Sequence, residues 1–144
     1  ISVTRHPDTA GYSVMRDSIV LPSSESFFTP GDEAVTFAHE VVHATGHPSR
    51  LGRMKSSEST QGIRKGTPEY AFEELVAELG ASFICAEMEV EGQLVQHASY
   101  IDSWLEALGK DKSLVAKAAA AASKAHALIL PPQLEDEPEE KLVA

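Results

Sequence analysis

The sequence predicts an α+β fold that is mostly helical, with a small N-terminal β-hairpin or sheet packed on the first long helix. Three observations favour this fold class. Short apolar runs with strand-like alternation are confined to the first 22 residues. Helical periodicity dominates from residue 32 onward, and capping residues and glycines mark the ends of the helical segments. The 144 residues are enough for one domain with a sizeable core.

We expect residues 1–131 to form this domain and residues 132–144 to be an acidic, disordered tail, because the last ten residues hold five acids and one Lys. The net charge of −10 argues against nucleic-acid binding by this chain alone. Neither a membrane-spanning apolar run nor a signal peptide is recognisable. The single cysteine, Cys85, excludes an internal disulfide and suits a cytoplasmic location. Since the chain begins at Ile1 rather than Met, we expect a fragment boundary there.

The N-terminal segment predicts a small β-structure. Residues 18–21 contain a run of Ile, Val and Leu, and we expect a strand there, paired in a hairpin with residues 11–15. Residues 1–10 are polar and predict no element. Phe27 and Phe28 follow a Ser-rich loop, and we expect both to anchor the core at the approach to the first helix.

The first helix is predicted to extend to about Thr45. Asp32 is the favoured cap within its start signal Thr29-Pro30-Gly31-Asp32, and Gly46, followed by Pro48, ends it. Residues spaced i, i+3 and i+4 are expected to form its buried face, namely Ala34, Phe37, Ala38, Val41 and Thr45.

Residues 47–66 are predicted to form a long loop rich in Ser and Gly. This loop holds the densest group of cations in the chain, namely Arg50, Arg53, Lys55, Arg64 and Lys65. A loop of this length inside a compact domain is commonly functional. Two interpretations of this loop remain open. It could be a lid or substrate-binding flap, or it could be only a solvated connection between two helices.

The second helix is predicted to be capped by Thr67, to have Pro68 at its first position and to extend to Met88. One of its stripes is apolar and consists of Phe72, Leu75, Val76, Leu79, Phe83 and Ile84. A second stripe places two carboxylates beside small residues that allow another helix to approach, and consists of Glu74, Glu78, Ala81 and Cys85. Further helices are predicted over about 95–108 and 112–130.

The segment His39-Glu40-Val41-Val42-His43 matches the pattern H-E-x-x-H on the first predicted helix. Residues four apart lie on the same face of a helix, so both imidazoles can bind one ion, with Glu40 beside the remaining open position. Zinc held in this way activates a water molecule, and the glutamate takes its proton. The sequence therefore predicts a catalytic metal site for Zn²⁺, with Mn²⁺ as the alternative ion.

A catalytic zinc normally takes a third protein ligand, for which the chain offers three candidates. His47 is disfavoured, because the metzincin motif H-E-x-x-H-x-x-G-x-x-H has its last His where this chain has Ser49. Glu74, followed four residues later by Glu78, fits the thermolysin-like pattern in which the first acid is the ligand and the second orients a histidine. The reverse assignment of these two stays open, and Glu73 is expected to point to a different face.

A zinc peptidase also needs a donor to the developing oxyanion. His97 and Tyr100 are three residues apart at the start of the third predicted helix, and either could point into the cleft as a catalytic group. The alternative is that Tyr100 belongs to the core and His97 to the surface.

Several segments carry a family resemblance, namely GYSVMRDSIVLP, HEVVHATGHPSRLGR, PEYAFEELVAELGASFICAEM, HASYIDSWLEALGKDK and AAAAASKAHALIL. Together they resemble the zincin-like metallopeptidase domain of ArdC-type antirestriction proteins, which also occurs in TraC-type plasmid primases and phage polyvalent proteins. The resemblance covers roughly residues 11–130 and implies a zincin-like fold. It also implies that His39 and His43 are ligands, that Glu40 is the catalytic base and that Glu74 is the third ligand.

The resemblance further implies a bacterial, plasmid- or phage-encoded protein that acts when mobile DNA enters a new host and is protected there from restriction. Full-length members have a separate N-terminal domain that binds single-stranded DNA, and nothing in this chain corresponds to that domain.

Three functional hypotheses follow. The first is a zinc-dependent endopeptidase acting on a protein or peptide of unknown identity, with no membrane partner. The second is a catalytically silent interaction module that the metal stabilises and that supports DNA transfer or antirestriction. The third, nucleic-acid binding by the basic residues 50–65, is weakened by the acidic charge of the chain.

Overall fold

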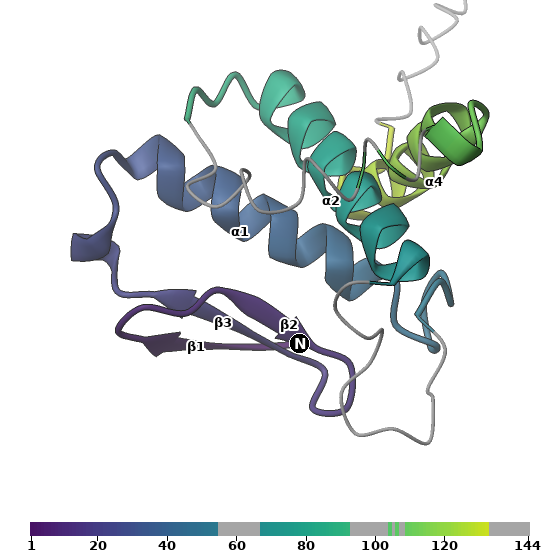
Figure 1. Cartoon of the computed structure of the whole chain (residues 1–144). Helices are drawn as coiled ribbons and strands as arrows, with labels where there is room; N and C mark the ends of the chain where they lie inside the picture. Colours follow the sequence, from purple (N-terminus) through teal and green to yellow (C-terminus); the bar gives the residue numbers. More distant parts are fainter. Residues whose placement is uncertain (55–66, 93–103, 105, 107–108, 133–144) are drawn as a thin grey trace, which may run out of the picture.

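A computed structural model of the chain describes residues 1–54, 67–92, 104, 106 and 109–132. These residues form a three-stranded sheet and three long helices, so the predicted α+β class is confirmed (Figure 1). The sheet lies on one side of the first helix, and the other two helices lie on its opposite side. Within the described ranges, no helix combines the length and the apolar character that crossing a membrane requires.

The sheet contains β1 (Ser2–His6), β2 (Gly11–Ser13) and β3 (Ser18–Pro22), in the order β1-β3-β2. The predicted hairpin is confirmed, because β2 pairs with β3 in antiparallel register. The strand β1 was not predicted, and it pairs with β3 in parallel. All its residues are exposed, so it carries no alternation of buried and exposed positions. Ile19 and Leu21 of β3 are only 1% and 2% exposed and face the core.

The helix α1 (Pro30–Thr45) begins with a capping box in which Thr29, not Asp32, is the cap. The Thr29 hydroxyl accepts a hydrogen bond from the Asp32 backbone N–H at 3.1 Å, and the Asp32 carboxylate accepts one from the Thr29 N–H at 3.2 Å. The prediction of Asp32 as the cap is therefore wrong. Pro30 occupies the first turn, where a missing N–H costs no hydrogen bond, and so the cap precedes it.

The buried face of α1 is broader than predicted, because the helix packs on the sheet with one side and on α2 (Pro68–Glu87) with the other. Val42 is fully buried, whereas Phe37, which was expected in the core, is 38% exposed. The expectation for the phenylalanines before the helix is also wrong. Phe28 is 92% exposed, and neither it nor Phe27 belongs to a core cluster.

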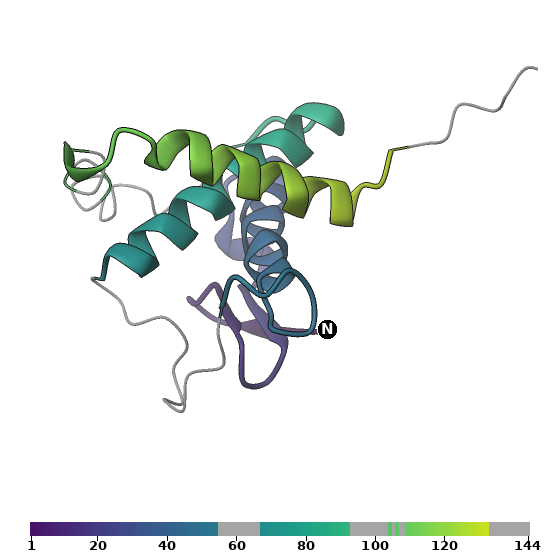
Figure 2. The same cartoon turned by 90° about the vertical axis from the view of Figure 1, so that its right-hand side faces the viewer.

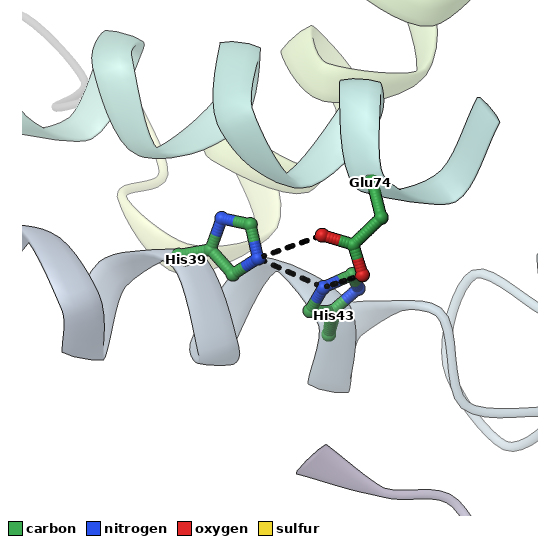
Figure 3. A group of neighbouring side chains, drawn as sticks. All are labelled: His39, His43 and Glu74. Atoms are coloured by element: carbon green, nitrogen blue, oxygen red, sulfur yellow. Dashed lines mark hydrogen bonds and ion pairs between the residues drawn. The ribbon is translucent and has the colours of Figure 1, made fainter. Parts of the chain in front are cut away.

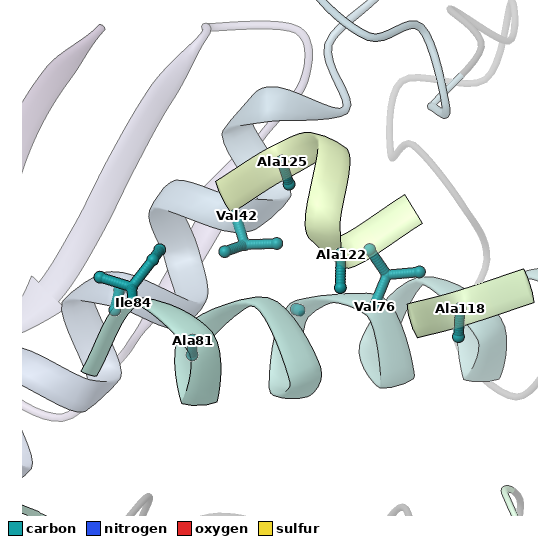
Figure 4. Packing of buried hydrophobic residues seen from close by; sticks show 9 residues of the cluster. Val42, Val76, Ala81, Ile84, Ala118, Ala122 and Ala125 are labelled. Carbon is teal, nitrogen blue, oxygen red and sulfur yellow. The ribbon is translucent and has the colours of Figure 1, made fainter. Parts of the chain in front are cut away.

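The main core lies where α1, α2 and α4 (Leu114–Ile129) meet (Figure 4). Figure 2 shows α4 lying across α2. The predicted helix over 112–130 is confirmed, and its small face is fully buried, namely Ala118, Ala122 and Ala125. Most of the predicted helix over 95–108 and the predicted tail from residue 133 lie outside the described residues, so the boundary at residue 131 stays a prediction.

Gly80 of α2 sets the distance between α1 and α2. A Cβ atom added at Gly80 would lie only 2.8 Å from both methyl carbons of Val42. Gly80 belongs to neither predicted stripe of α2, whereas Glu74 and Ala81 of the small-residue stripe are buried at 6% and 1% exposure. Within the predicted apolar stripe, Val76 and Ile84 are buried in the core, and the other members are partly buried against it. The start of α2 is as predicted, since the Thr67 hydroxyl accepts a hydrogen bond from the Tyr70 N–H.

We expect Gly80→Ala to lower the free energy of unfolding by about 1 kcal/mol. Overpacking against the stiff Val42 side chain costs about 1–3 kcal/mol, and the gain in helix propensity returns at most about 1 kcal/mol. Urea denaturation measures the difference. Ser82→Ala, at an exposed position of the same helix, serves as the control and should not destabilise the protein. Wild-type stability of Gly80→Ala would contradict the packing described here.

Candidate metal centre

The two histidines of the H-E-x-x-H pattern lie one turn apart on the buried side of α1. His39 is 7% exposed and His43 is 8% exposed. Their Nε2 atoms approach to 3.0 Å, and the rings meet edge to face with centroids 4.7 Å apart. Both imidazoles therefore turn the same ring nitrogen toward one point between α1 and α2.

Glu74 reaches that point from α2 (Figure 3). One carboxylate oxygen lies 3.4 Å from Nε2 of His39, and the other lies 3.5 Å from Nε2 of His43. The candidate ligand atoms of the three residues all lie within 4.8 Å of one another. The structure thus brings together the two histidines and the glutamate that the sequence analysis selected.

The spacing of these atoms fits a small divalent ion. Zinc binds imidazole nitrogen and carboxylate oxygen at about 2.0–2.2 Å, so tetrahedral ligand atoms lie about 3.3–3.5 Å apart. The two Nε2 atoms lie 3.0 Å apart, and they lie 3.4 and 3.5 Å from different oxygens of Glu74, so each of these separations is close to this value with both carboxylate oxygens facing the histidines. Two imidazoles and one carboxylate are also a donor set that suits zinc, and manganese accepts the same ligands.

The electrostatics of the centre favour a cation. Burial alone would lower the pKa of His43, but its hydrogen bonds with Glu73 and Glu74 outweigh burial and raise this pKa to about 10. Burial would likewise raise the pKa of Glu74, but its hydrogen bonds with the two histidines hold it well below its usual range. The pKa of His39 is raised by Glu74 and Glu78 against the effect of burial. A histidine must be deprotonated at the nitrogen that binds a metal. An ion bound here would therefore take the place of the proton that the neighbouring carboxylates favour on each imidazole.

Glu40 lies in the same buried environment and is 6% exposed. Burial raises its pKa, the negative charge of Glu74 adds to this effect, and His43 and His39 oppose it. A carboxylate with a raised pKa is a stronger base than one in water. Its chemistry therefore suits proton transfer, as expected for the glutamate of the H-E-x-x-H pattern.

Each histidine has a further carboxylate behind it. Nδ1 of His39 lies 3.4 Å from Glu78, and Nδ1 of His43 lies 3.3 Å from Glu73. Glu78 was predicted at such an orienting position, whereas Glu73 was expected to point to a different face. That expectation is wrong, because Glu73 is only 3% exposed and lies beside His43. Helical spacing separates the two glutamates by direction but does not give the angle at which α2 crosses α1.

The segment after α1 is held by two arginines of the predicted cationic loop. Arg50 donates to the Ala44 carbonyl at 2.6 Å and pairs with Asp17, which joins the end of the helix to the turn between β2 and β3. Arg53 donates to the Val42 carbonyl at 2.9 Å and pairs with Glu73. These two cations therefore stabilise the helix end, while residues 55–66 of the loop lie outside the described residues.

The remaining candidates stand apart from the centre or outside the described residues. His47 is not part of the three-residue group, and its Nδ1 accepts a hydrogen bond from the Ser49 N–H at 3.1 Å. The proposed oxyanion donors His97 and Tyr100 lie outside the described residues, so their roles stay predictions.

The sequence of this chain is similar to a known protein family and to several known proteins. Residues 1–121 match the family model described as zincin-like metallopeptidase. The chain is 37% identical over 123 residues to the DNA primase TraC of Escherichia coli, covering 85% of this chain and 11% of TraC. It is 32% identical over 125 residues to the uncharacterized protein y4eC of Sinorhizobium fredii, covering 86% of this chain and 39% of that protein.

Two solved structures are similar as well. The Mn(II)-bound crystal structure of the antirestriction protein ArdC from the R388 plasmid matches with a TM-score of 0.74 and 36% identity, covering 89% of this chain and 46% of that chain. The metal-free structure of ArdC also matches with a TM-score of 0.74. The chain therefore spans less than half the length of these relatives.

The metal-free protein should lose stability as the pH rises from about 6.5 to about 10. The folded state raises the pKa of His43 from 6.5 to about 10, so its contribution is complete below about pH 6.5 and disappears as the pH passes about 10. Urea denaturation in excess chelator at a series of pH values measures the decline. His43→Gln, which lacks this titration, should show a smaller decline over the same range, and parallel curves for the two proteins would contradict the prediction.

Proposed function

This chain belongs to the zincin-like metallopeptidase family, as a domain of the ArdC and TraC type, and we propose that it is a zinc-dependent metallopeptidase. The observation that carries the proposal is the convergence of His39, His43 and Glu74 on one point, with Glu40 buried beside them. These three residues are the proposed metal ligands. Glu78 faces Nδ1 of His39 and Glu73 faces Nδ1 of His43, and in this proposal each carboxylate orients the histidine that it faces.

A divalent ion bound by these residues would supply an acidified water molecule and would polarise the substrate carbonyl. Glu40 accepts the proton of that water and passes it to the leaving amine. Burial favours the first transfer, because it raises the pKa of Glu40 and so makes its carboxylate a better base. Nδ1 of each histidine faces a carboxylate, so the rings keep their Nε2 atoms turned toward the ion.

Zinc is the proposed ion, because two imidazoles and one carboxylate form a typical zinc donor set. The structure of ArdC contains Mn(II), so manganese is the alternative for this chain. At the level of the whole protein, we propose that the domain serves an ArdC-like antirestriction protein or another mobile-element protein. Its substrate is then a protein or peptide, and contact with single-stranded DNA belongs to a separate domain.

One observation favours a second candidate function, a catalytically silent interaction module that the metal stabilises. Each of the four side chains of the proposed centre is less than a tenth exposed, namely His39, Glu40, His43 and Glu74. A centre this well covered also fits an ion that holds α1 and α2 together. Peptide hydrolysis by the metal-loaded protein separates the two candidates.

We expect Glu74→Gln to weaken the binding of Zn²⁺ and Mn²⁺ by more than about 100-fold, because it removes one of three ligands and the only charged one. Titration calorimetry on the metal-free protein measures the affinity. Zinc at 100 times its Kd should stabilise the wild type by about 2.7 kcal/mol and the variant far less. Glu69→Gln, at an exposed position of the same helix, is the control. Equal affinity of Glu74→Gln and wild type would eliminate Glu74 as a ligand.

We expect Glu40→Gln to bind metal like the wild type and to lose hydrolysis by about 10²–10⁴-fold, since it removes the general base and keeps the ligands. Cleavage of labelled casein and of a mixed peptide library by the metal-loaded proteins measures activity. Glu33→Gln, in the first turn of the same helix, should retain activity. Full activity of Glu40→Gln would rule out this mechanism, and metal binding without hydrolysis in the wild type would support the interaction module.

A further inference from the structure

Glu73 is held by Arg53 through two parallel hydrogen bonds. Arg53 Nη2 donates to Oε1 at 2.8 Å, and Arg53 Nε donates to Oε2 at 2.9 Å. The same Oε1 atom lies 3.3 Å from Nδ1 of His43. Both carboxylate oxygens thus have a fixed partner, and the carboxylate cannot rotate away from the imidazole without breaking a bidentate pair.

Arg53 is in turn anchored to the last turn of α1. Its Nη1 donates to the Thr45 hydroxyl at 2.9 Å, and its Nη2 donates to the Val42 carbonyl at 2.9 Å. The guanidinium therefore uses its planar set of donors to connect the backbone beside His43 with the carboxylate that faces the ring of His43. Its side chain is only 13% exposed, so water competes weakly for these contacts.

We propose that Arg53 is a positioning residue of the metal centre, and that it acts through Glu73 on His43. By donating to both oxygens of Glu73, Arg53 fixes this carboxylate so that Oε1 faces Nδ1 of His43 as an acceptor. His43 must then carry its proton on Nδ1, which leaves Nε2 free for the ion. This inference rests on the proposed function, because it assigns Arg53 a role in the metal binding proposed there.

Arg50 provides a matched comparison within the same segment. It also donates to a carbonyl at the end of α1, that of Ala44, and also forms an ion pair with a carboxylate, that of Asp17. Its pair faces the turn before β3 rather than the histidines. If stabilisation of the helix end were the whole role of such an arginine, then loss of either one would have similar consequences.

The test compares Arg53→Met, Glu73→Gln and the double variant with the control Arg50→Met. Zn²⁺ affinity is measured by calorimetry on the full chain at one pH, and the free energy of unfolding is measured without metal. Arg53→Met and Glu73→Gln should each weaken binding about 10- to 100-fold, and Arg50→Met should bind like the wild type. The double variant should bind no more weakly than Glu73→Gln, because Arg53 acts through Glu73. The double variant also removes both members of the ion pair, so it leaves no buried charge unpaired. It can therefore still be measured if Arg53→Met does not fold.

A spectroscopic measurement reports on the hydrogen bond itself. In zinc-loaded protein labelled with ¹⁵N-histidine, the Nδ1 proton of His43 should give a downfield resonance protected from exchange in the wild type and in Arg50→Met. In Arg53→Met this resonance should move upfield and exchange faster. A purely structural role for Arg53 would leave the resonance unchanged, and fully additive losses of affinity in the double variant would also overturn the proposal. Failure of the wild type to bind zinc is a separate outcome, which would reject the proposed metal site itself.

Discussion

The close approach of α1 and α2 is the constraint on which the rest of the structure depends. The two helices meet at Gly80, where a side chain would collide with the methyl groups of Val42. At this separation Glu74 of α2 reaches both imidazoles of α1. Packing and chemistry therefore share one interface, and the small residues that bring the helices together also determine where Glu74 meets His39 and His43.

Burial of charge at this interface creates a need for compensation. Glu40, Glu73 and Glu74 are each less than a tenth exposed, and such groups are costly unless they are paired. Arg53 pairs with Glu73, and the two histidines lie within ion-pair distance of Glu74. A divalent ion suits such a centre, since it would bind the neutral imidazoles and neutralise the carboxylate between them.

The sequence predicted those features that depend on local spacing. The histidine pair follows from helical period, and the hairpin and the start of α2 follow from alternation and capping chemistry. Features that depend on tertiary geometry were missed. The exposed strand β1 has no internal signal, Phe28 lies next to a helix but points into solvent, and Glu73 acquires its partners only when α1, α2 and the following segment assemble.

The ion pair between Arg53 and Glu73 joins residues 20 positions apart in the sequence. It therefore closes the chain between α1 and α2 in the absence of any metal. The conformational entropy lost on closing such a loop grows only with the logarithm of its length, so a doubling adds about 0.6 kcal/mol. A longer connection would therefore cost little stability, provided that Arg53 and Glu73 at its two ends remain. The contact between α1 and α2, and with it the position of Glu74, would then not depend on the length of the segment that connects the two helices.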